Sequence, residues 1–250
     1  MINLLISGIN GAMGKTLLTV VKDYDELNVT AGVDKNIAGI EGISVYDSFD
    51  KVEEKVDVVI DFSTPGVLTS MLEYCIKNKA AAVICTTGYS FEQENMVVEA
   101  SESVPILRSA NMSLGVNLVA HLAKIASSFL GKEFDVEIVE KHHRRKIDAP
   151  SGTALMLANE INSVNDNKYN YVYERESTRQ SRNSNDMGIH SIRGGSIVGE
   201  HEIIFAGTDE TITISHSISS RTVFAVGAVK SALFISKKEK GFYRISDILE

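Results

Sequence analysis

Short apolar runs of strand length recur through the first half of the chain and alternate with helical patterns. Helices are expected from Pro65 to about Asn78 and again after Ser90, where Ser90 and Gln93 have the spacing of a capping box. Strands that alternate with helices in this way are typical of a parallel sheet covered on both faces. The apolar runs are 2–7, 27–33, 57–62, 80–85 and 105–108.

The pattern changes to strict alternation at Phe134. Apolar side chains at Val136 and Ile138 alternate with acidic ones at Asp135 and Glu137, as in a strand with one solvated face. The second half is therefore expected to be α+β. Its other expected elements are an apolar helix at about 115–129, a polar loop at 162–185, hairpin strands at 196–205 and 211–217, and a helix at 221–234.

Three glycines separate the first strand from the first helical pattern. Gly8 can make the tight turn, Gly11 lets the backbone approach a phosphate, and Gly14 lets the helix pack closely on the strand. The spacing is G-x-x-G-x-x-G, so the match to the usual dinucleotide motif is imperfect. Asp34 ends the second strand, where an acid meets the adenosine ribose, whereas Lys35 suits a 2′-phosphate. This pair leaves NAD and NADP both open, and a turn acid beside a solvated lysine is the simpler alternative.

Two further polar turns follow predicted strands. Thr86-Thr87-Gly88 can lie along a nicotinamide or ribose, and Ser109 to Ser113 leads into the apolar helix. The carboxyl ends of parallel strands are where such sheets bind ligands, although either turn can also be a plain connection.

These patterns predict an α/β fold with an N-terminal Rossmann-type dinucleotide-binding domain and a mostly parallel sheet. We expect this domain to comprise residues 1–112 and 222–250, because a last apolar segment at 243–249 is expected to return to it. Residues 113–221 form the second, α+β domain.

The segment Glu140 to Ala154 contains the candidate catalytic and anion-binding residues. His142, His143 and Lys146 supply groups that donate protons, and Lys146 adds a point charge for an oxyanion. A helix is expected directly after Pro150 and Ser151, and its first amides would face a bound anion. The simpler interpretation is a basic turn with an ordinary helix cap.

Composition narrows the class of protein. The chain has 250 residues, 44% of them hydrophobic, and a formal charge of -8, which argues against a nucleic-acid binder. No secretion signal is recognised and no apolar run approaches the ~20 residues of a membrane span, so we expect no membrane partner and a cytoplasmic protein. The two cysteines lack zinc-site spacing, and no metal is expected at His190, His201 and His216.

Taken together, these motifs resemble the 4-hydroxy-tetrahydrodipicolinate reductase family, also called dihydrodipicolinate reductase, of the diaminopimelate route to lysine. The resemblance spans nearly the whole chain, and the Glu140 block is its most specific part. It implies reduction of 4-hydroxy-tetrahydrodipicolinate to tetrahydrodipicolinate by NADH, NADPH or both. It also implies a second domain that binds substrate and assembles a homotetramer.

The resemblance also implies residue roles. His142 and Lys146 are the expected proton donors, and His143, Gly152 and Thr153 contact the substrate carboxylates. Many members have arginine at the position of Ala12, so one positive charge that would contact a cofactor phosphate is missing. Cys85 stands where glycine is usual. The expected cofactor positions are Gly8, Ile9, Asn10, Gly11, Ala12, Met13, Asp34, Lys35, Cys85, Thr86, Thr87, Ser109, Ala110, Asn111 and Met112.

Two other classes remain open on the sequence alone. One is a regulator that binds NAD(H) without chemistry and uses the basic cluster for an effector. The other is a related oxidoreductase acting on a different small dicarboxylate.

Overall fold

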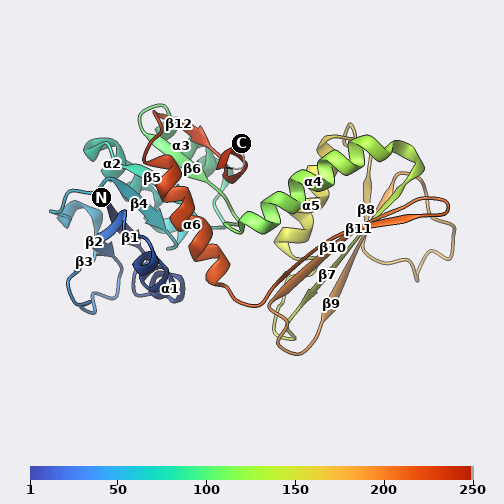
Figure 1. The fold of residues 1–250 in the computed structure, drawn as a ribbon, viewed down its shortest axis with the longest axis horizontal. Helices are drawn as coiled ribbons and strands as arrows, with labels where there is room; N and C mark the ends of the chain where they lie inside the picture. The colour runs from blue at the N-terminus through green and yellow to red at the C-terminus, as the bar shows by residue number, and fades with distance from the viewer. Residues whose placement is uncertain (249–250) are drawn as a thin grey trace. The chain divides into compact units, whose positions relative to one another are not determined.

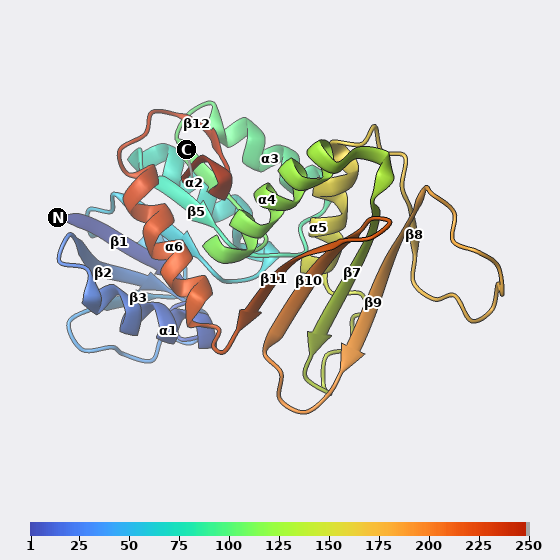
Figure 2. The ribbon, with the colours of Figure 1, turned by 45° about the vertical axis from the view of Figure 1, so that its right-hand side comes forward.

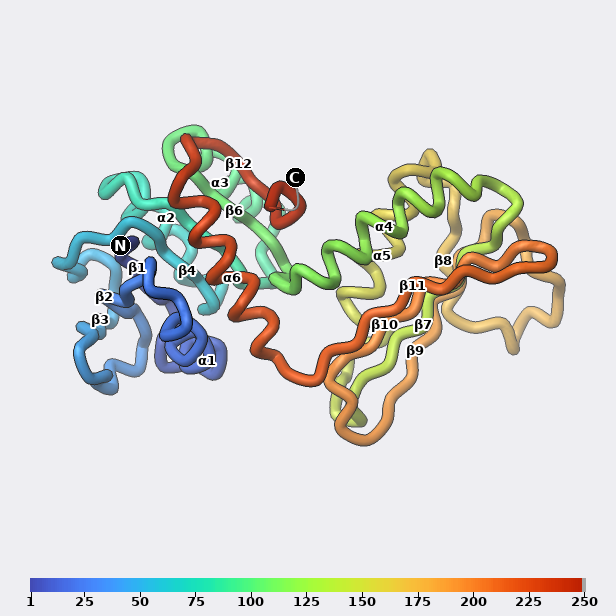
Figure 3. Tube along the Cα trace, viewed as in Figure 1, coloured from blue at the N-terminus to red at the C-terminus, as the bar shows by residue number. Residues whose placement is uncertain are grey.

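The computed structural model describes residues 1–248, and the chain folds as two compact units (Figure 1). The first unit contains Met1–Ser113 together with the segment that begins at Thr222, and the second contains Leu114–Arg221. The tube view shows the same course, with the C-terminal segment returning to the sheet that the N-terminus begins (Figure 3).

The first unit is built on a seven-stranded sheet in which every pair of neighbouring strands is parallel. The strand order is β12-β6-β5-β4-β1-β2-β3. The six strands from β3 to β6 have the doubly wound order of dinucleotide-binding folds. The strands are β1 (Ile2–Ser7), β2 (Leu27–Val33), β3 (Ser44–Tyr46), β4 (Val58–Asp61), β5 (Ala81–Ile84), β6 (Pro105–Arg108) and β12 (Gly241–Tyr243).

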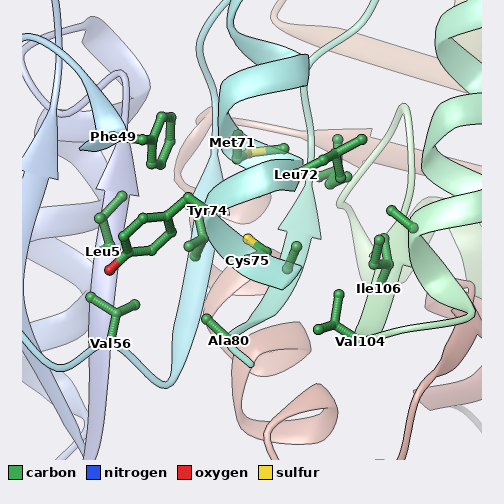
Figure 4. Close-up of a cluster of buried hydrophobic side chains, with 14 of the residues drawn as sticks. Leu5, Phe49, Val56, Met71, Leu72, Tyr74, Cys75, Ala80, Val104 and Ile106 are labelled. Atoms are coloured by element: carbon green, nitrogen blue, oxygen red, sulfur yellow. The ribbon is translucent and has the colours of Figure 1, made fainter. Parts of the chain in front are cut away.

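Helices cover both faces of this sheet. On one face lie α1 (Ala12–Val20) and α6 (Thr222–Ile235), which contact each other. On the other lie α2 (Leu68–Asn78) and α3 (Phe91–Ser101). Alternate strand residues such as Leu5 and Ile106 pack with α2 side chains in one apolar core, where the rings of Phe49 and Tyr74 are 5.5 Å apart (Figure 4). Short 3-10 turns lie at Val21–Asp23, Phe49–Lys51, Pro65–Val67 and Ile245–Ile248.

The second unit places two helices on one face of a five-stranded mixed sheet, ordered β11-β10-β7-β9-β8 (Figure 2). Burial alternates strictly along β7, as the sequence predicts, and its core face ends in Glu140 and His142. The elements are α4 (Leu114–Leu130), a 3-10 turn (Gly131–Glu133), β7 (Asp135–His142), α5 (Gly152–Ser163), β8 (Asn170–Val172), β9 (Asp186–Arg193), β10 (Gly199–Ala206) and β11 (Thr211–Ile218).

The predicted fold class is confirmed, but two expectations are wrong in detail and two strands were not predicted. The polar stretch 162–185 is not only a loop, because β8 pairs there with β9. The sequence also does not predict β9 or the three-residue β3. Finally, the segment Leu114–Glu133 is long and apolar enough to cross a bilayer by length and composition, contrary to the expectation that no run approaches that length. This test is weak, because core helices also pass it, and Val119, Ala120 and Ala123 of α4 lie in the core of the second unit.

Candidate active site

The glycine turn of the first unit has the geometry of a phosphate cradle. Gly8 has φ +81°, as a tight turn requires, and a Cβ on Gly14 would lie 2.3 Å from the carbonyl oxygens of Gly8 and Ile9. Gly11 is the N-cap of α1, and among the described residues no side chain caps this helix. The first amides of α1 are therefore available to phosphate oxygens.

A cavity of about 350 Å³ adjoins this turn and is lined by Gly8, Gly11, Asp34 and Lys35, among others. The Asp34 carboxylate accepts hydrogen bonds from the backbone amides of Asn10 and Asn36, both at 2.9 Å, so its position at the end of β2 is set by the backbone. Within the described part of the chain, the Ser7 hydroxyl is buried without a hydrogen-bond partner. The glycine turn, the helix start and the adjoining cavity together fit a dinucleotide.

The other predicted cofactor turns lie at the same edge of the sheet. Cys85–Thr87 follow β5 and Ser109–Met112 follow β6, and both strands run parallel to β1. The Thr86 hydroxyl is buried in the turn that follows β5. Burial and the nearby Asp61 carboxylate raise the pKa of the Cys85 thiol, which argues against a nucleophilic role.

His142 ends β7 in the second unit as a buried imidazole. Its Nδ1 lies 2.6 Å from Glu140 Oε2, and its ring meets that of His201 edge-on with centroids 5.3 Å apart. A Cβ on Gly199 of β10 would lie 3.2 Å from His142 Nε2, so the missing side chain leaves space beside this nitrogen. Within residues 1–248 no protein hydrogen bond to Nε2 is found, and this nitrogen can serve a ligand.

The turn after β7 carries the other predicted donors. The Lys146 amide donates to the His143 carbonyl oxygen at 3.0 Å, and Lys146 Nζ donates to Asp148 Oδ2 at 2.8 Å. The hydrogen bond from Lys146 lowers the pKa of Asp148, so this carboxylate is ionised near pH 7. His143 Nδ1 is buried and lacks a partner in the described part of the chain, whereas Arg144 is exposed.

Ser151 begins α5, as the sequence predicts. Its Oγ accepts from the Ala154 amide at 3.1 Å and lies 3.2 Å from His201 Nε2. Burial and the neighbouring His142 lower the pKa of His201 to about 4, so this histidine is neutral near pH 7. Gly152 and Thr153 form the first turn of the helix, whose amide end attracts anions.

The second unit therefore gathers all five predicted catalytic and substrate-binding residues on the segment between β7 and the first turn of α5. The three other histidines considered for a metal do not converge. His190 binds Glu137 at 2.9 Å, while His201 and His216 pair across β10 and β11. Among the described residues, no group of three or more potential ligands has the arrangement of a metal site.

Family models match both parts of the chain. The model described as dihydrodipicolinate reductase, N-terminus, matches residues 2–112, and the model for the C-terminus matches residues 115–249. The chain belongs to the dihydrodipicolinate reductase family. It is thus an oxidoreductase whose family reaction belongs to lysine biosynthesis.

Individual relatives align with this chain along its full length. The 4-hydroxy-tetrahydrodipicolinate reductases of Caldanaerobacter subterraneus subsp. tengcongensis and Clostridium tetani are 49% and 44% identical. Both alignments cover 100% of this chain, and 99% and 97% of the relatives. A solved dihydrodipicolinate reductase from Paenisporosarcina sp. TG-14, with dipicolinate bound, is 26% identical with a TM-score of 0.83 and covers 98% of this chain and 97% of its own.

Three residues that surround His142 were not among the site residues predicted from the sequence. Glu140 and His201 contact its imidazole, and Arg193 donates hydrogen bonds to Glu140. The one available signal was the two-residue spacing of Glu140 and His142, which places both on one face of a strand.

Proposed function

We propose that the chain reduces 4-hydroxy-tetrahydrodipicolinate to tetrahydrodipicolinate with a nicotinamide cofactor and that His142 donates the proton. The observation that carries this assignment is the state of its imidazole. Nδ1 is bound to Glu140, whereas Nε2 has no protein hydrogen bond within the described chain and lies beside the space above Gly199. A buried, oriented imidazole with one available nitrogen is suited to general acid catalysis.

The reduction needs one proton in addition to the hydride. Loss of the 4-hydroxyl group and one hydrogen as water leaves a conjugated cyclic imine. A bound nicotinamide supplies the hydride, and the ring nitrogen or carbon that gains the electron pair then needs one proton. His142 Nε2 is the group we assign to give it, with Lys146 stabilising the negative charge that develops.

The two substrate carboxylates need positive potential and hydrogen-bond donors. We assign these roles to His143, Lys146 and the amides of Gly152 and Thr153 at the start of α5. Lys146 is paired with the exposed Asp148 and must exchange this partner for a substrate carboxylate. The dipicolinate named in the Paenisporosarcina structure is itself a dicarboxylate, which supports this assignment.

For the cofactor, we propose that Gly8–Met13, Asp34 and Lys35, and the turns Cys85–Thr87 and Ser109–Met112 hold the dinucleotide. We further propose that NADH is preferred over NADPH. Asp34 is held by two backbone amides where it can accept from the ribose hydroxyls, and Asp47 lines the same cavity. A 2′-phosphate would bring about two negative charges against these carboxylates, and Lys35 is exposed and less fixed.

This preference is tested by Asp34→Ala, measured as KM for each cofactor. We expect KM for NADH to rise about tenfold, the effect of one lost charge-assisted hydrogen bond, while KM for NADPH falls or stays unchanged. The control Lys35→Ala should raise only the KM for NADPH. A wild-type protein that prefers NADPH would contradict the proposal.

We also propose that the chain acts in the cytoplasm as a homotetramer assembled through its second unit. The support is the family resemblance. Sedimentation equilibrium of the purified protein tests the assembly, and a monomer at micromolar concentration would contradict it.

The reaction itself is tested by following NADH and NADPH oxidation with synthase-generated substrate. We expect cofactor oxidation that requires the synthase product. Cofactor binding without turnover would instead indicate a regulator, and turnover only with another dicarboxylate would indicate a different reductase.

A further inference from the structure

Glu140 is a carboxylate with no solvent exposure, although it lies beside a candidate active site. It is the position two residues before His142 on β7, so both side chains lie on the same face of the strand. Its Oε2 lies 2.6 Å from His142 Nδ1, and its Oε1 accepts from the Ser151 amide at 3.1 Å. One carboxylate therefore connects the imidazole to the start of α5.

Arg193 holds this carboxylate from the neighbouring strand. It lies opposite His142 in the β7/β9 register, and its guanidinium donates to both Glu140 oxygens, at 2.8 and 2.6 Å. The same guanidinium donates to the Asp148 carbonyl oxygen at 2.7 Å. Arg193 therefore fixes both Glu140 and the segment that leads into Ser151.

Glu140 is ionised in this setting. Burial opposes ionisation, but hydrogen bonds from Arg193, Ser191 and His142 outweigh it and lower the pKa of Glu140 to about 2. An ionised carboxylate only accepts hydrogen bonds, so His142 Nδ1 must be the donor in their contact. The exchangeable proton of the imidazolium is then the one on Nε2.

We propose that Glu140 is a positioning residue that holds His142 in its Nδ1-protonated form and aims Nε2 at the substrate, with Arg193 keeping Glu140 in place. The proposal rests on the role assigned to His142 above. The same physical arrangement orients the imidazole of a Ser-His-Asp triad, where the carboxylate acts without touching the substrate.

A purely structural role is the alternative, because removing a buried charge partner destabilises a fold. The chain contains a matched comparison on the same strand. Glu137 on the opposite face of β7 accepts from Arg175, Arg182 and His190 Nε2, at 3.2, 2.9 and 2.9 Å. Glu137→Gln therefore disrupts a similar carboxylate, arginine and histidine cluster without touching His142.

The test compares Glu140→Gln with Glu137→Gln in the full-length protein. We expect Glu140→Gln to lower kcat about 100-fold, at the low end of what general acid catalysis contributes, with a change in the Kd for dipicolinate of roughly threefold or less. Glu137→Gln should leave kcat unchanged even where it lowers Tm. A Glu140→Gln variant with kcat within about twofold of wild type would overturn the proposal.

A second readout does not depend on turnover. In protein labelled with ¹⁵N-histidine, the neutral His142 ring should carry its proton on Nδ1 in the wild type and lose this preference in Glu140→Gln. If the wild-type protein shows no turnover but His142 still carries its proton on Nδ1, the proposed reaction is rejected. The positioning role of Glu140 then stands. An unchanged tautomer in Glu140→Gln would reject the role of Glu140 alone.

Conservative variants keep the test decisive if Glu140→Gln does not fold. Arg193→Lys keeps the charge but loses the two-pronged contact, and Glu140→Asp keeps the carboxylate on a shorter side chain. Both should lower kcat by less than Glu140→Gln and in the same direction. Folded variants of both kinds with wild-type kcat and wild-type His142 signals would contradict the proposal.

Discussion

Gly199 of β10 leaves the space into which His142 Nε2 faces. A Cβ at this position would lie 3.2 Å from Nε2, closer than ordinary van der Waals contact. We expect Gly199→Ala to push the imidazole by a few tenths of an ångström and to lower kcat about tenfold, because catalytic groups tolerate little displacement.

The matched control is Gly194→Ala in the turn after β9. Its added Cβ would meet nothing within 4 Å, and the Gly194 amide keeps its hydrogen bond to the His142 carbonyl oxygen. Steady-state kinetics and thermal unfolding of both variants separate crowding from destabilisation. Equal kcat values for the two variants would show that the space above Gly199 is not needed.

His201 makes stability depend on pH. Its pKa is about 4 in the folded protein because of burial and the nearby His142, against 6.5 for the ordinary side chain. Between these values the unfolded chain binds more protons, so the free energy of unfolding falls as pH drops from about 6.5 to about 4. The pKa difference corresponds to ~3 kcal/mol.

We expect urea unfolding to show this loss in the wild type and a shallower pH dependence, by about one proton, in His201→Gln. His216, whose pKa is also lowered by burial, retains its own smaller contribution in both proteins. Parallel pH profiles for the two proteins would contradict the assignment of a neutral, buried His201.

Two helix starts allow a comparison at the scale of elements. Ser151 caps α5 beside the candidate anion site, and Ser90 caps α3 through a full capping box in the first unit. Each serine-to-alanine change removes a capping hydrogen bond, which costs about 1 kcal/mol. We expect both variants to lose similar stability, but only Ser151→Ala to raise the Kd for dipicolinate, by about threefold to tenfold.

Isothermal titration with dipicolinate, together with denaturant unfolding, measures both quantities. If Ser90→Ala weakens dipicolinate binding as much as Ser151→Ala, the start of α5 is not part of the anion site.

The sequence predicted well those elements that are buried on one face or on both faces. The observed β1 and β2 have the predicted bounds, and the Ser90 capping box is confirmed, because local hydrogen bonding determines these features. In contrast, β9 contains His190 and Arg193, whose side chains bind carboxylates of β7, and Asp186, which pairs with Arg175. Its apolar pattern is therefore too weak to predict a strand, and β3 and β8 have only three residues each.

At the scale of the whole molecule, the predicted cofactor-binding residues and the predicted catalytic residues lie in different units, as their order along the chain suggests. The turns expected to hold the dinucleotide belong to the first unit, and the His142 segment belongs to the second. What the sequence could not provide is the set of contacts between distant residues. Glu140 and Arg193 are 53 positions apart, and Ser151 and His201 are 50 apart, so only the folded sheet brings them together.

The central claim is that His142 supplies a proton to a substrate reduced by a separately bound nicotinamide. The most direct measurement is kcat for NADH oxidation by His142→Gln with synthase-generated substrate, alongside the Kd for NADH. The account predicts a loss in kcat of about 100-fold or more, with the Kd for NADH within roughly twofold of wild type. Turnover by His142→Gln at the wild-type rate would contradict it.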